Sequence, residues 1–176
     1  MKSKGFTLYE LLITLVIIGI TLAIAIPSFN KQLYQSRTEV AALTLLDAIE
    51  TSRSTAIFKN TRTMLLANDK KWHSGWILFV DSDNDGTYDE DETMIRREGT
   101  LTGVSISSAK APMDSYISFI GTGEGRKPGK ANAGAFLAGT IKICPEQYGS
   151  GYVLVLSRGG RTRIAKLPPE ECTFTR

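Results

Sequence analysis

Residues 5–26 read GFTLYELLITLVIIGITLAIAI, and this stretch decides how the rest of the chain is organised. From Phe6 to Ile26 it holds 21 residues, of which Glu10 is the only charged one. In a helix that rises about 1.5 Å per residue, a run of this length reaches about 32 Å and crosses a hydrocarbon layer of about 30 Å. We therefore expect residues 6–26 to form a membrane-spanning helix.

A short basic segment precedes the apolar run, with Lys2 and Lys4 as its charged residues. Basic residues beside a membrane span stay on the cytoplasmic side, so the rest of the chain should face outward. An ordinary secretory signal would carry a small-residue cleavage site after the apolar run, but residues 27–30 read PSFN. The leader, residues 1–5, therefore ends before the apolar run.

Glu10 is the anomaly of the span, because a carboxylate in an apolar helix costs on the order of 3 kcal/mol unless it finds a partner. The stretch from Gly5 to Glu10, GFTLYE, resembles the prepilin signature, with a Gly before the scissile bond and an aromatic first mature residue. The resemblance implies that a prepilin peptidase cuts between Gly5 and Phe6 and methylates the new amine. It also implies that Glu10 meets the N-terminus of a neighbouring subunit. The alternative is a plain signal anchor with a stray Glu.

Pro27 predicts a kink, because proline lacks a backbone donor and clashes with the preceding turn. Beyond it, apolar residues recur at the spacings of an amphipathic helix. These residues are Phe29, Leu33, Val40, Leu43, Leu46 and Ile49. We expect the helix to continue to about Phe58 and to pack this face on a head domain.

Residues 59–176 carry strand-like runs separated by turn residues. The runs are 62–66, 75–80, 93–97, 104–107, 116–120, 140–144, 152–157 and 163–167. A chain of 176 residues that is 42% hydrophobic supports one medium-sized core. One long helix followed by short strands predicts an α+β fold, with an antiparallel sheet packed on the helix. The expected parts are the leader (1–5), the helix (6–58) and a β-rich head (59–176).

Cys144 and Cys172 are the only two cysteines, and both lie in the last third of the chain. We expect them to form a disulfide, which implies an oxidising compartment. Closing a loop of 29 residues would stabilise the fold by roughly 3–4 kcal/mol. Two reduced thiols are the alternative, although the sequence has no CxxC redox or zinc pair.

Several motifs stand in the predicted head: Gly75–Asp81 followed by Asp85 and Gly86, then Thr140–Cys144, and Leu154–Ser157 before Gly160–Arg163. They resemble the GspH/FimT group of minor pilins and pseudopilins. Together with the prepilin signature, the resemblance covers nearly the whole chain and implies a long helix packed on a C-terminal sheet domain. It implies other pilin subunits and the prepilin peptidase as partners, and the inner membrane as the location before assembly.

Charge is divided unequally along the chain. Residues 59–120 carry 7 basic and 10 acidic side chains, whereas residues 121–176 carry 9 basic and 4 acidic ones. A basic end of this kind indicates a surface for an acidic partner. Its segment Gly160–Arg163, GRTR, follows a strand, and Gly159 and Gly160 permit a hairpin turn. In a strand, Arg161 and Arg163 share one face.

Guanidinium groups match phosphate oxygens in bidentate fashion, so a DNA backbone fits this face. GRTR also resembles the GRxR motif of the FimT branch of the family, which is implicated in DNA capture during natural transformation. The resemblance implies Arg161 and Arg163 as the main DNA-binding residues. Supporting positions are Arg158, Lys166, Arg126, Lys127 and Lys130. The alternative is a solvated hairpin with ordinary surface arginines.

The DNA contact should be weak, non-specific and sensitive to salt, because one subunit engages few phosphates. Aromatic residues for base stacking are few nearby, namely Tyr148, Tyr152 and Phe174, so duplex DNA is as suitable as single strands. The Gly- and Ala-rich segment 121–139, which holds three of the supporting basic residues, is expected to be a mobile loop.

An acidic stretch has the D-x-D-x-D-G-x5-E spacing of an EF-hand calcium loop. The matching positions are Asp81, Asp83, Asp85, Gly86, Asp89 and Glu92. Strand-like runs flank it, where an EF-hand has helices, so a solvent-exposed acidic hairpin is favoured over a calcium site. No other cofactor is expected.

His73 is the only histidine, expected at the start of a strand, and it lacks the partners that catalysis or metal binding requires. We expect no enzymatic activity. The leading hypothesis is a minor type IV pilin with its head in the periplasm before assembly and on the pilus afterwards, where it binds extracellular DNA for uptake. A structural or initiating minor pilin, or a type II secretion pseudopilin without DNA binding, is the alternative. A calcium-dependent adhesin at the fibre tip is a third hypothesis.

Overall fold

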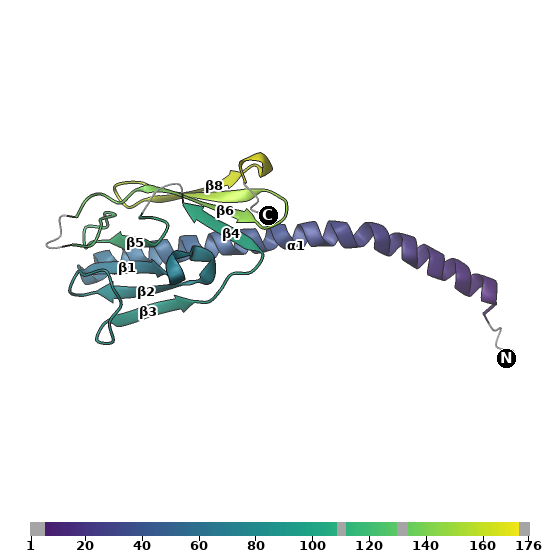
Figure 1. Cartoon of the computed structure of the whole chain (residues 1–176), viewed down its shortest axis with the longest axis horizontal. Coiled ribbons are helices and arrows are strands. Elements are labelled where there is room, and N and C mark those ends of the chain that lie inside the picture. Colours follow the sequence, from purple (N-terminus) through teal and green to yellow (C-terminus); the bar gives the residue numbers. More distant parts are fainter. Residues whose placement is uncertain (1–5, 109–111, 130–133, 173–176) are drawn as a thin grey trace. The chain divides into compact units, whose positions relative to one another are not determined.

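The computed structural model describes residues 6–108, 112–129 and 134–172 (Figure 1). Gly5, Lys130 and Phe174 lie outside the described residues. The chain divides into two compact units, Met1–Leu33 and Tyr34–Arg176. The long helix α1 (Leu8–Lys59) contributes to both, so the division falls inside the helix and not at its end.

The first unit is described from residue 6 to residue 33, and every side chain in it is exposed. An 18-residue window of α1 has a mean hydropathy of 2.5, so by length and composition the helix can cross a membrane. The helix runs from Leu8 to Lys59 with Pro27 inside it, so the proline does not end the helix.

The second unit, the head, buries one face of α1 that differs from the predicted face. The buried residues are Thr38, Ala41, Ala42, Leu45, Ala48, Ile49, Ser52 and Ala56. Phe29, Leu33, Val40 and Leu43 of the predicted stripe are exposed, so that part of the prediction was wrong. Small residues dominate the buried face, which lets the sheets approach the helix closely, and periodicity of large apolar residues alone cannot reveal such a face.

Eight antiparallel strands form two four-stranded sheets in the head (Figure 1). The first sheet contains β1 (Arg62–Ala67), β2 (Trp76–Asp81), β3 (Thr93–Glu98) and β5 (Tyr116–Phe119), in the order β3-β2-β1-β5. The second contains β4 (Val104–Ser108), β6 (Gly139–Pro145), β7 (Gly151–Leu156) and β8 (Thr162–Leu167), in the order β4-β6-β7-β8. Every predicted strand is present, with both ends within one residue of the predicted bounds. The predicted α+β class is confirmed, with two sheets where one was expected.

The core lies between α1 and the inner faces of the two sheets. Trp72 and Trp76 are among its largest side chains and meet edge to face, with their ring centroids 6.2 Å apart. The Trp72 indole N–H donates to the carbonyl of Met113 at 2.8 Å. The described part of the head also contains three short 3-10 helices: η1 (Asn68–Lys70), η2 (Trp72–Ser74) and η3 (Pro169–Glu171).

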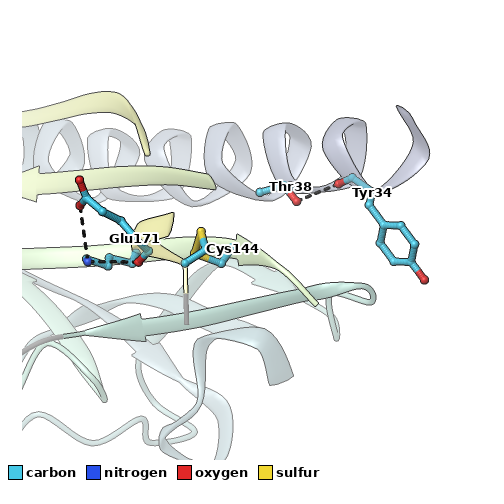
Figure 2. Close-up of a disulfide and its surroundings, with 6 residues drawn as sticks. Tyr34, Thr38, Cys144 and Glu171 are labelled. Carbon is cyan, nitrogen blue, oxygen red and sulfur yellow. Dashed lines mark hydrogen bonds and ion pairs between the residues drawn. A yellow bond between two sulfur atoms is a disulfide. The ribbon is translucent and has the colours of Figure 1, made fainter. Parts of the chain in front are cut away.

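Cys144 and Cys172 form the predicted disulfide, with their Cα atoms 5.7 Å apart. Both residues are buried beside Leu167 and Val153. Figure 2 shows the bridge next to an ion pair between Lys142 of β6 and Glu171 of η3, whose Nζ and Oε2 lie 3.9 Å apart. The bridge therefore holds the segment after β8 against the second sheet.

Candidate nucleic-acid interface

The segment GRTR begins in the turn of the β7–β8 hairpin, as the sequence predicts. Three hydrogen bonds close the turn: Ser157 N–H to the Arg161 carbonyl (2.9 Å), Gly160 N–H to the Ser157 carbonyl (3.0 Å), and Arg161 N–H to the Ser157 hydroxyl (3.1 Å). The strands pair in register from Leu156–Thr162 to Gly151–Leu167. The turn residues therefore connect two regularly paired strands.

Gly160 is required at this position for two reasons. Its φ of +79° lies in the left-handed region that favours glycine, and a Cβ atom would overlap the carbonyl oxygen of Gly123. The same carbonyl accepts a hydrogen bond of 3.1 Å from the Nε of Arg53 on α1. The tip of the hairpin thus docks on the turn around Gly123 and on the helix, which restricts its movement.

Arg158, Arg161 and Arg163 are all exposed. Arg161 and Arg163 line one shallow depression together with Val155, Ser157 and Thr162. Among the residues that the structure describes, none of these three arginines pairs with a carboxylate. Three guanidinium groups are therefore available on one hairpin.

Lys166 is exposed but faces differently from the arginine pair. It pairs across the hairpin with Tyr152, which is buried, whereas Arg163 pairs with Val155. Because side chains alternate along a strand, Lys166 stands on the opposite face of β8 from Arg163. The alternation was visible in the sequence and separates Lys166 from the depression.

Arg126 is held by contacts inside its own segment. Its Nη2 lies 2.9 Å from the Oε2 of Glu124, and its guanidinium stacks 3.7 Å above the ring of Phe136. Lys127 is half-buried, and its N–H donates to the carbonyl of Ala135. Bridges join Phe119 to Gly125 and Arg126 to Phe136, so the described parts of 121–139 are anchored at these points, and the mobility of the segment stays a prediction.

The acidic stretch forms the connection between β2 and β3. Asp81 is the last residue of β2, and its side chain is fully buried. Burial, together with the smaller effect of the nearby Glu92 carboxylate, raises the pKa of Asp81 to about 6. Arg62 and the N–H groups of Asn84 and Gly86 lower this pKa, although none of them makes a hydrogen bond of good geometry to the carboxylate.

Arg62 of β1 lies beside this loop and is also buried. Its Nε lies 3.8 Å from an Asp81 oxygen and donates instead to the Asn84 side-chain oxygen at 2.9 Å. Its Nη1 donates to the Ser118 hydroxyl at 2.7 Å and to the Arg126 carbonyl at 3.1 Å. Arg62 therefore links the acidic loop to the segment that supports the basic hairpin. Its role was missed in the sequence, because the contacts depend on the non-local pairing of Arg62 with Asp81.

The predicted assembly residue, Glu10, lies in the first turn of α1. Thr7 and Glu10 make a capping box, in which the Thr7 N–H donates to Glu10 Oε2 at 2.9 Å and the Glu10 N–H donates to the Thr7 hydroxyl at 3.3 Å. Phe6 precedes the cap and is exposed. The T-x-x-E spacing could have revealed the cap in the sequence.

His73 lies in η2 and not at the start of a strand, as was predicted. Its carbonyl accepts a hydrogen bond of 2.8 Å from the Leu101 N–H. The residue borders a shallow depression with Ser105 and Glu146.

Two family models match the chain. The model described as type II transport protein GspH matches residues 41–160, and the prokaryotic N-terminal methylation motif matches residues 1–26. Among solved structures, the type IV minor pilin FimU of Pseudomonas aeruginosa superposes with a TM-score of 0.56 at 18% identity. That match covers 78% of this chain and 92% of FimU, so the two share a fold.

Curated relatives match mainly over shorter stretches. A fimbrial protein of Moraxella nonliquefaciens is 53% identical over 54 residues, which are 30% of this chain and 34% of the relative. A fimbrial protein of Pseudomonas aeruginosa is 43% identical over 69 residues, which are 39% of this chain and 44% of the relative. The chain thus spans less than half the length of these two relatives.

A type IV narrow pilus major component of Thermus thermophilus is 34% identical over 90 residues, which are 49% of this chain and 78% of that protein. The GspH model covers most of the head, the methylation motif covers the predicted prepilin signature, and the fold is that of a minor pilin. The chain therefore belongs to the GspH family and is a minor type IV pilin or GspH-like pseudopilin with an N-terminal methylation motif.

Proposed function

We propose that this pilin binds the phosphate backbone of extracellular DNA through Arg158, Arg161 and Arg163. The observation that carries the proposal is the exposure of these three guanidinium groups, without carboxylate partners among the described residues, on a hairpin whose tip is fixed by Gly160. A guanidinium that is not already paired can give its donors to phosphate oxygens. Arg126 is left out of the set, because Glu124 and Phe136 already engage it.

The interface favours contact with the backbone over contact with bases. Tyr152 is buried and Tyr148 packs edge to face on Tyr34 of α1, with their ring centroids 5.9 Å apart. Neither is placed as a free stacking platform beside the arginines. Binding is therefore independent of sequence and weak for a single subunit, and presentation on a fibre supplies the function.

Processing and assembly bring the hairpin to the cell surface in this proposal. The prepilin peptidase cuts between Gly5 and Phe6, the head stays in the periplasm while α1 anchors the subunit in the inner membrane, and Glu10 contacts the N-terminus of a neighbouring subunit. The proposed role is that of the FimT branch, and the resemblance of GRTR to the GRxR motif of that branch implies it. The likeness to FimU supports the fold alone.

The test compares two double variants of equal charge. Arg161→Gln with Arg163→Gln removes the arginine pair, and Arg97→Gln with Lys71→Gln removes two exposed cations elsewhere on the head. For the full chain in detergent micelles, fluorescence anisotropy with labelled duplex DNA should show at least about tenfold weaker binding for the first variant only. In cells, the first variant should lose transformation while keeping normal pili.

Equal losses in the two variants would mean that net charge alone attracts DNA, and would overturn the assignment of a site. Unchanged binding in the arginine variant would support the second candidate function, a structural or initiating subunit of a pilus or pseudopilus. The exposed apolar first unit and Phe58 at the end of α1 favour such a role in protein contacts.

A further inference from the structure

The acidic loop between β2 and β3 places its end positions side by side. Val80 of β2 pairs with Thr93 of β3 at the base of the hairpin. Asp81 comes directly after Val80 and Glu92 directly before Thr93, so these two residues begin and end the loop next to the paired strands. These residues are positions 1 and 12 of the calcium-loop spacing. The two strands thus bring together the ends of the loop, a task that the flanking helices perform in an EF-hand.

Three carboxylates converge inside the loop. One oxygen each from Asp81, Asp83 and Asp85 lies within 4.8 Å of the others. Calcium binds oxygens at about 2.3–2.6 Å, so ligands on opposite sides of one ion are about 4.6–5.2 Å apart. The three oxygens therefore fit around a single ion of this size.

Asp81 supplies the observation that distinguishes this cluster from an ordinary acidic surface. Its side chain is fully buried, and among the described residues neither carboxylate oxygen has a hydrogen-bond partner of good geometry, although the N–H groups of Asn84 and Gly86 lie near it. Arg62 is 3.8 Å away and directs its Nε to Asn84. A buried carboxylate is normally hydrogen-bonded, so two unsatisfied oxygens, one of which lies in the cluster with Asp83 and Asp85, favour a cation as the partner of this carboxylate.

We propose that the loop 81–92 binds one calcium ion through Asp81, Asp83 and Asp85, with Asp89 and Glu92 completing the oxygen ligands. Gly86, with a φ of +81°, occupies position 6, where the calcium loop needs a glycine for its sharp turn. Glu92 is buried and closes the loop, with its Oε1 accepting from the Ser82 N–H at 2.8 Å and its Oε2 from the Asp89 N–H at 3.4 Å. Calcium accommodates such an irregular set of oxygens, whereas magnesium requires a near-ideal octahedron.

The loop itself offers a matched control. Asp83 and Asp85 are at ligand positions, whereas Asp91 is an exposed carboxylate at a position that does not coordinate in this spacing. Changing each of them singly to Asn removes the same charge. Asn also keeps the side-chain oxygen that accepts from the Asp85 N–H at residue 83 and from the Thr87 N–H at residue 85.

The experiment titrates calcium chloride into the chelator-treated full chain in detergent micelles by calorimetry. The unchanged protein should bind one ion with a Kd of about 1 mM or lower, prefer calcium to magnesium, and melt at a higher temperature when calcium is present. Asp83→Asn and Asp85→Asn should each weaken binding by at least about tenfold, while Asp91→Asn stays within about twofold.

Two results would overturn the site. One is a folded wild-type protein with neither saturable heat nor a calcium-dependent melting shift up to about 10 mM, beyond the weakest calcium modules. The other is an equal loss in Asp91→Asn and Asp83→Asn, which would show diffuse attraction of cations by the acidic loop. Equal affinity for magnesium would contradict the assignment of calcium as the ion.

Discussion

At the scale of single residues, the motif GRTR combines a packing requirement with a candidate binding surface. Gly160 is needed because the hairpin tip lies against Gly123, whereas Arg161 and Arg163 point into solvent. The shared face of the two arginines could be predicted from strand alternation. The pairing of Arg126 with Glu124 could not, because it depends on how a loop without regular structure folds back on itself.

Replacing Gly160 by Ala should lower the free energy of unfolding of the head by about 2–4 kcal/mol, since a left-handed φ and a backbone clash are both imposed. Gly159→Ala is the matched control, because a Cβ there meets no atom within 4 Å. Urea unfolding followed by the fluorescence of Trp72 and Trp76 measures both. Similar stabilities for the two variants would show that the hairpin tip does not dock on Gly123.

At the scale of elements, the positions of the strands were more predictable than the face of α1 that is buried. Each strand carries its own alternation and turn signals, so all eight were placed from local sequence alone. The buried face of α1 is lined by Ala41, Ala42, Ala48 and other small residues, and the larger Val40 and Leu43 remain exposed. Which face of α1 is buried depends on how closely the two sheets approach the helix. Contacts between residues that are far apart in the sequence determine this approach.

Two leucines of α1 test this assignment of faces. Leu45 is 0% exposed and Leu43 is 50% exposed in the head. Leu45→Ala should cost about 2–5 kcal/mol of unfolding free energy, because it leaves a cavity in the core. Leu43→Ala should cost less than about 1 kcal/mol. Thermal melting of the full chain measures both variants. A larger loss of stability for Leu43→Ala than for Leu45→Ala would show that α1 does not pack its Leu45 face against the sheets.

At the scale of the whole molecule, the two units differ in how much of each could be predicted from the sequence. The N-terminal signature could be recognised from the sequence, because cleavage and assembly depend on a contiguous stretch of residues. The acidic spacing was equally visible, but the burial of the Asp81 carboxylate beside Arg62 depends on the pairing of β1 with β2. In the head, residues 121–128 contact both candidate sites, because Gly123 supports the hairpin tip and Pro128 lies beside Gly86 of the acidic loop.

The salt dependence of DNA binding tests the central claim most directly. Each phosphate contact contributes about −0.9 to the slope of log K against log salt for duplex DNA, so three arginines predict a slope of about −2.7. Arg161→Gln with Arg163→Gln should reduce it to about −0.9, while Arg97→Gln with Lys71→Gln leaves it unchanged. A slope that is the same in the wild type and the arginine variant would contradict a DNA-binding hairpin.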